Sequence, residues 1–124
     1  MGRPIDQDFF SRLAELSERF AAEVPALLER LASASAAFDT AAPDLALAEE
    51  VQTLLHTMAG SAATFGFRVL GHQARLLEQR LRVLMAFDEV QEAHWNAWFA
   101  DLDCLVAWGL IDPKATYYID ESEQ

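Results

Sequence analysis

Apolar residues recur every three or four positions along nearly the whole chain, which is the spacing of a buried helix face. Only five glycines and four prolines interrupt the 124 residues. No stretch alternates between apolar and polar residues, as a half-buried strand would. The pattern therefore predicts helices throughout and no sheet.

The first half of the chain predicts two helices. Asp6 or Asp8 would cap the first helix, and Pro25 falls inside its apolar pattern, which predicts a kink or a break there. Pro43 lies near the first position of a second helix, and Gly66 is suited to end that helix. The first apolar face contains Phe9, Leu13, Leu16, Phe20, Val24, Leu27, Leu31 and Ala34.

The second half predicts two more helices. The third covers about 68–85, and Asp88 with Gln91 resembles a capping box that would open the fourth. Gly109 is placed to end the fourth helix. The apolar residues expected to pack along the fourth helix are Ala93, Ala97, Leu102 and Leu105. Trp95, Trp98 and Trp108 are also interpreted as packing of this helix, with at least one of them expected to be partly exposed.

Short connections between helices of this length favour an antiparallel arrangement. We therefore expect an all-α fold: an antiparallel up-down four-helix bundle with a kinked or split N-terminal helix. The length suits a single domain, 1–124, with the bundle over about 6–110 and a C-terminal tail over 111–124.

The charge balance and the cysteine count exclude several classes of function. The chain has 20 acidic and 9 basic residues, and a surface this acidic repels nucleic acid and anionic membranes. No apolar run is long enough to span a bilayer. Cys104 is the single cysteine, and no Cys/His cluster has the spacing of a zinc site. We expect a cytoplasmic monomer with no metal or cofactor of its own.

One histidine stands on an unusual helix face. With Met58 at the centre of the core side of the second helix, His56 lies nearly opposite, in solvent. Ala59, Gly60 and Ala63 follow on its side, so the face is expected to be bare of large side chains. Glycine inside a helix costs about 1 kcal/mol relative to alanine, which close approach of a macromolecule would explain. The alternative is an ordinary surface histidine beside a tolerated glycine.

The run from His56 to Phe67, His-Thr-Met-Ala-Gly-Ser-Ala-Ala-Thr-Phe-Gly-Phe, resembles the signature of the histidine phosphotransfer (HPt) domain family. Its last six residues look especially like the phosphotransfer domain of chemotaxis histidine kinases. Further on, Ala74 and the run Leu76-Leu77-Glu78 resemble the family's Ala-x-x-Leu-Glu. The helix count and order also fit the family.

The resemblance implies that His56 accepts a phosphoryl group on Nε2 and passes it on. Gly60 matches the glycine that lets a receiver domain come close, and Glu78 matches the acidic residue that hydrogen-bonds the other ring nitrogen. The implied partners are a response regulator receiver domain and a hybrid histidine kinase, with Mg²⁺ held in the receiver's acidic pocket. Such a protein is a phosphoryl carrier rather than a turnover enzyme.

The sequence departs from the family at one position, because Ala59 stands where the family usually has lysine. That lysine would neutralise phosphoryl oxygens during transfer. Arg75 is the first candidate to supply the cation instead, and Arg68 is a weaker one. Otherwise transfer is slow or lost, and the domain binds its partner without chemistry.

Other interpretations stay open on the sequence. The bundle is either a phosphotransfer carrier, a binding-only module that sequesters a receiver domain, or a structural or oligomerising protein without one. Glu78 falls only at the core boundary of its helix, so a solvated charge is the plain alternative for it. Phe9, Phe10 and Leu13 are candidates for an apolar docking surface near His56, with bundle core favoured for at least two of them.

Overall fold

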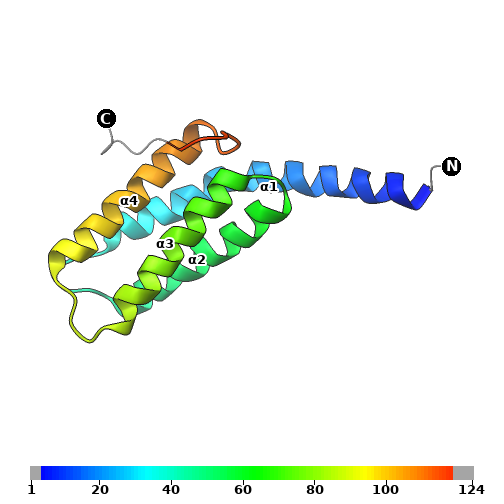
Figure 1. Cartoon of the computed structure of the whole chain (residues 1–124). Coiled ribbons are helices and arrows are strands. Elements are labelled where there is room, and N and C mark those ends of the chain that lie inside the picture. The colour runs from blue at the N-terminus through cyan, green and yellow to red at the C-terminus, as the bar shows by residue number, and fades with distance from the viewer. Residues whose placement is uncertain (1–3, 119–124) are drawn as a thin grey trace.

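Four α-helices form an antiparallel bundle in the computed structural model, which describes residues 4–118 (Figure 1). They are α1 (Pro4–Ala37), α2 (Leu45–Thr64), α3 (Arg68–Ala86) and α4 (Glu92–Ile111). Successive helices run in opposite directions, and the N-terminal part of α1 extends well beyond the other three (Figure 1). The predicted all-α up-down bundle is confirmed. No helix in the described part of the chain is both long and apolar enough to cross a membrane.

The first helix is longer than the sequence pattern indicates. It begins at Pro4, before both Asp6 and Asp8, so neither aspartate caps it. It also runs through Pro25 without a break. The proline lacks a backbone N–H, so the helix lacks one backbone hydrogen bond at this exposed position.

The second helix has well-defined ends. The Asp44 carboxylate accepts hydrogen bonds from the backbone N–H groups of Ala46 (3.0 Å) and Leu47 (3.4 Å), which caps its start. Gly66 follows its last turn with a φ of 87°, a conformation that glycine adopts at little cost. The predicted stop at this glycine is confirmed.

The fourth helix differs from the prediction at both ends. Its N-cap is Gln91, with no side-chain cap hydrogen bond, so the capping box proposed for Asp88 is wrong. Gly109 does not end the helix, which continues to Ile111. The glycine is buried instead, and a Cβ there would lie 2.8 Å from Leu28 Cδ1. Gly109 therefore serves the close packing of α4 on α1.

Aromatic side chains fill the core where the end of α1 meets α4. The ring of Phe38 lies 5.1 Å from that of Trp95 and 4.4 Å from that of Phe99. Trp98 is buried too, and its Nε1–H donates to the Leu77 carbonyl of α3 (3.0 Å). Because these large rings set the inward face of α4, Ala93 and Ala97 are exposed rather than buried as expected; Trp108 is only partly buried.

The helices that position the candidate site, α2 and α3, pack closely against each other. A Cβ on Gly71 of α3 would lie 3.2 Å from Ala62 Cβ and 3.3 Å from the Ala59 carbonyl oxygen of α2. A side chain there would force α2 and α3 apart by a few tenths of an ångström. Gly71 therefore allows the close crossing of these two helices.

Candidate functional site

His56 lies on the solvent side of α2, with 67% of its side chain exposed. Its Nδ1 is 2.9 Å from Oε2 of Glu78 on α3. Within residues 4–118, the other ring nitrogen, Nε2, has no hydrogen-bond partner. The two helices therefore hold one nitrogen of the imidazole and leave the second accessible.

Glu78 is the buried charged residue of the described core, with its side chain only 6% exposed. The same Oε2 atom also accepts a hydrogen bond from the Arg82 guanidinium (3.0 Å), one turn further along α3. A carboxylate is costly to bury unless such pairing compensates. The plain alternative of a solvated charge is therefore wrong, because this carboxylate is buried and pairs with His56 of α2.

This arrangement determines what the imidazole can do. An ionised carboxylate only accepts hydrogen bonds, so Nδ1 must carry the proton in the bond to Glu78. A neutral imidazole protonated on Nδ1 has its lone pair on Nε2. Carboxylates that bind a histidine in this way fix its tautomer and ring orientation. The site presents an oriented nitrogen nucleophile to solvent.

The helix face beside His56 is only partly bare. Gly60 and Ala63 are exposed, and a Cβ on Gly60 would meet nothing within 4 Å. Ala59, in contrast, is 2% exposed, so its expected place on the open face is wrong. Gly71 brings α3 against the Ala59 carbonyl and thereby covers this residue.

Gly60→Ala is expected to stabilise the isolated protein by about 0.5–1 kcal/mol, because alanine is the better helix former and no neighbour obstructs its methyl group. Chemical denaturation checks this value. If a partner approaches this face, Gly60→Leu will slow phosphotransfer several-fold, whereas Ala97→Leu, an exposed position on α4, will not. Equal rates for both leucine variants would contradict a close approach at Gly60.

The cations proposed from the sequence lie beside the site. Arg75 and Arg68 are exposed on α3 and line a groove that Ala59 also lines, and no described residue forms an ion pair with either. Arg82, which contacts Glu78 directly, was not singled out in the sequence. The only signal for it was its spacing of four residues from Glu78. In the described chain, no group of three or more His, Cys, Asp or Glu residues could hold a metal ion.

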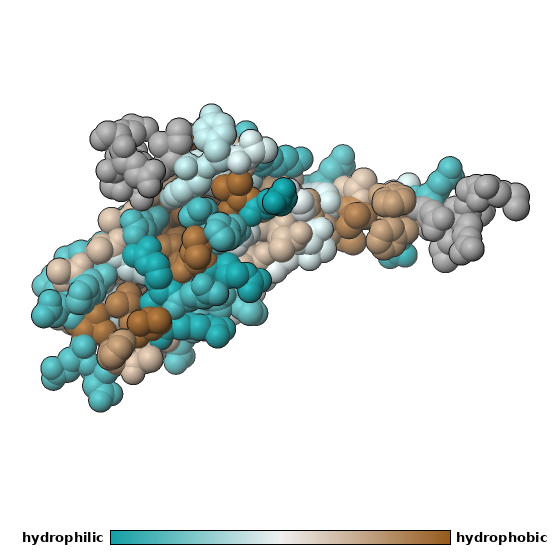
Figure 2. Space-filling view, in the orientation of Figure 1, coloured by the Kyte–Doolittle hydropathy of each residue, from teal (hydrophilic) through white to brown (hydrophobic). Residues whose placement is uncertain are grey.

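The start of α1 contradicts the expectation that its first apolar side chains belong to the bundle core. Phe9 and Phe10 are 60% and 65% exposed and Leu13 is partly exposed, so bundle core is wrong for them. This part of α1 projects beyond the bundle, where no other helix covers it, and its apolar surface is visible in Figure 2. At a rise of 1.5 Å per residue, Phe9 lies roughly 30 Å along the bundle from His56. These rings do not flank the imidazole.

Comparison with known proteins adds one finding to this geometry. The Hpt domain family model matches residues 15–107, which is most of the chain and covers α2, α3 and the larger part of α1 and α4. No curated protein and no solved structure matches the chain. The chain therefore belongs to the Hpt domain family, whose members carry phosphoryl groups on a histidine in two-component phosphorelays and interact with receiver domains and kinases.

Proposed function

We propose that this protein carries a phosphoryl group on Nε2 of His56, accepting it from a receiver-domain aspartate or a kinase and passing it to a response regulator. The observation that supports the proposal best is the pairing of His56 Nδ1 with the buried Glu78 carboxylate, which leaves Nε2 exposed. An ordinary surface histidine would not need a buried charge beneath it.

The transfer is a displacement at phosphorus. The Nε2 lone pair attacks the phosphorus of the aspartyl phosphate in line, an N–P bond forms, and the P–O bond to the aspartate breaks with the electron pair leaving on the carboxylate. The Nδ1 proton stays on the ring, which becomes positively charged. Glu78 stabilises that charge without taking the proton.

The cation at the phosphoryl group is the second element of the proposal. Because Ala59 replaces the family's usual lysine, we assign the neutralisation of phosphoryl oxygens to Arg75, which lines the same groove as Ala59. Arg82 is bound to Glu78 and acts through that carboxylate. Mg²⁺ would come with the partner's receiver domain.

A binding-only role is the second candidate, and the buried methyl group of Ala59 is the observation that favours it. In that case a receiver domain docks over His56 and no phosphoryl group moves. The two functions predict the same complex and differ only in the chemistry.

A transfer assay separates them. The protein is mixed with a panel of ³²P-phosphorylated receiver domains in Mg²⁺, with an established Hpt protein as the positive control. Acid-labile, base-stable label on this protein supports the carrier function. Saturable receiver binding without label supports the binding-only function. Neither label nor binding, with the control labelled, would contradict both.

A further inference from the structure

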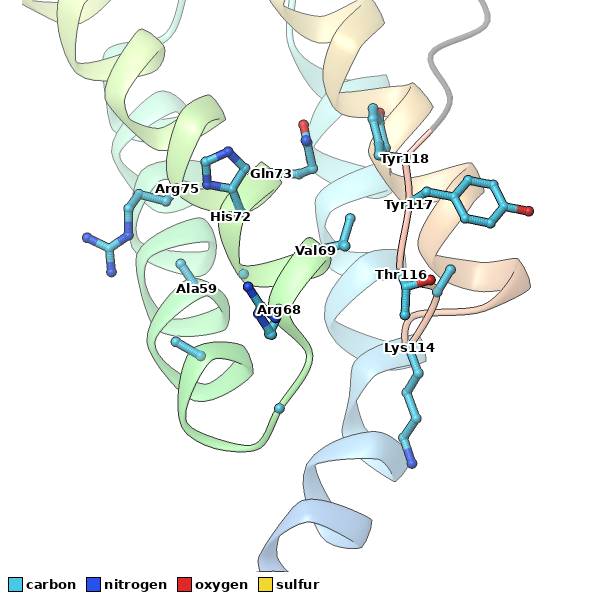
Figure 3. A pocket seen from close by; sticks show the side chains of 14 residues that line it. Ala59, Arg68, Val69, His72, Gln73, Arg75, Lys114, Thr116, Tyr117 and Tyr118 are labelled. Carbon is cyan, nitrogen blue, oxygen red and sulfur yellow. The ribbon is translucent and has the colours of Figure 1, made fainter.

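A groove of about 840 Å³ adjoins the candidate site. Its walls are α2, the N-terminal half of α3 and residues 114–118, which follow α4 (Figure 3). Ala59, one turn beyond His56, and Arg75, one turn before Glu78, both line it. A protein seated over His56 would therefore lie at the edge of this groove.

The groove is basic in a strongly acidic protein. Arg68, His72, Arg75 and Lys114 line it, and no Asp or Glu among residues 4–118 does. Three of the chain's nine Lys and Arg residues therefore line this groove, although the chain carries 20 acidic residues. Arg68 and Lys114 lie on its two sides, and the Arg75 guanidinium points away from residues 114–118 (Figure 3). The local charge is opposite to that of the molecule as a whole.

These cations are also unpaired. Arg80 and Arg82 form ion pairs with Asp101 and Glu78, whereas none of the three groove cations has a carboxylate partner in residues 4–118. The Lys114 ammonium lies 5.4 Å from the centroid of the Phe67 ring, a contact that holds it without neutralising it. Their charge is available to a ligand.

The wall formed by residues 114–118 is fixed to the bundle. Trp108 Nε1–H donates to the Tyr117 carbonyl (3.1 Å), and the rings of Trp108 and Tyr118 lie 5.3 Å apart. This segment therefore keeps Lys114 across the groove from Arg68, as Figure 3 shows.

We propose that this groove docks an acidic segment on the surface of the protein that donates or receives the phosphoryl group. The inference rests on the proposed function and adds a specificity determinant to it. An acidic chain repels acidic partners in general, so a local basic groove beside His56 steers such a partner into the productive orientation and raises its association rate. The cationic side chains are long and exposed, which suits contacts with an extended acidic surface better than tight binding of a small anion.

Charge reversal tests the inference. The double variant Arg68→Glu, Lys114→Glu is compared with Arg12→Glu, Arg30→Glu, which makes the same charge change at exposed positions of α1 outside the groove. At low salt, the groove variant is expected to lower the second-order rate of transfer from a phosphorylated receiver by about 10-fold. Its rate should also depend less on salt, while the α1 variant stays within about 2-fold of wild type.

Three further measurements separate the possible failures: labelling by phosphoramidate, receiver binding and binding of inorganic phosphate. Phosphoramidate, a donor too small to need a docking surface, should label His56 equally in all three proteins. If receivers label the wild type and the groove variant at equal rates, the docking inference is overturned and the proposed function stands. If neither donor labels the wild type, the proposed function fails, and a receiver-binding assay on the same variants then decides the groove alone. Tight binding of inorganic phosphate in the groove, with receiver rates unchanged by charge reversal, would make it a small-anion site and overturn the inference.

Discussion

His56→Gln is expected to reduce phosphoryl labelling on the order of 1,000-fold or more, to the background of the assay. Glutamine resembles histidine in size and polarity, but its amide nitrogen has no available lone pair to attack phosphorus. Because 67% of the His56 side chain is exposed, the substitution should hardly change the thermal unfolding midpoint. Filter-bound ³²P after incubation with a phosphorylated receiver measures the effect.

The other two histidines provide matched controls. His72 and His94 are both exposed, so either could accept label if a reactive imidazole were sufficient. His72→Gln and His94→Gln should each retain the wild-type label. Label that survives His56→Gln, or is lost with His72→Gln alone, would contradict the assignment of the acceptor.

Glu78→Ala is expected to slow transfer by about 10- to 100-fold, the usual effect of removing a carboxylate that orients a reactive imidazole. Without the Oε2 acceptor at 2.9 Å, nothing holds the proton on Nδ1. The neutral ring should then shift toward the form protonated on Nε2, the nitrogen that must attack. ¹⁵N spectra of the ring report this shift directly, whereas loss of stability alone would not produce it.

Two variants calibrate this prediction. Glu78→Gln keeps an oxygen that can accept from Nδ1 but loses the charge, so it should keep the wild-type tautomer with an intermediate rate. Arg82→Gln removes the guanidinium from Oε2 and keeps the bond to His56, so its effect should be smaller than that of Glu78→Ala. An unchanged tautomer and an unchanged rate in Glu78→Ala would show that the carboxylate does not position the ring.

The helices were predictable because each buries a stripe of apolar residues whose spacing is visible in the sequence. Gly66 was also predictable, since a glycine after the last periodic residue commonly ends a helix. The same rule predicts that Gly109 ends a helix, and there it fails. This glycine is needed for packing against Leu28 of another helix, which the spacing within one helix does not reveal. Apolar residues lie on most sides of α4, so their spacing did not identify which of its alanines face outward.

The candidate site was only partly predictable for the same physical reason. His56 and Gly60 stand out within a single helix, where exposure follows from periodicity. Glu78 was identified through family resemblance alone, because its burial depends on the packing of α3 against the other helices. The burial of Ala59 likewise depends on the approach of a second helix. The contact of Arg82 with Glu78 lies within α3, where only the four-residue spacing of the two residues indicates it.

The central claim is that Nε2 of His56 carries the phosphoryl group while Glu78 holds Nδ1. Coupling between ³¹P and ¹⁵N in the phosphorylated, histidine-labelled protein tests it most directly, because it identifies the bonded nitrogen atom. The account predicts one phosphohistidine, at His56, with phosphorus bonded to Nε2 and a proton retained on Nδ1. Phosphorus on Nδ1, or on any residue other than His56, would contradict it.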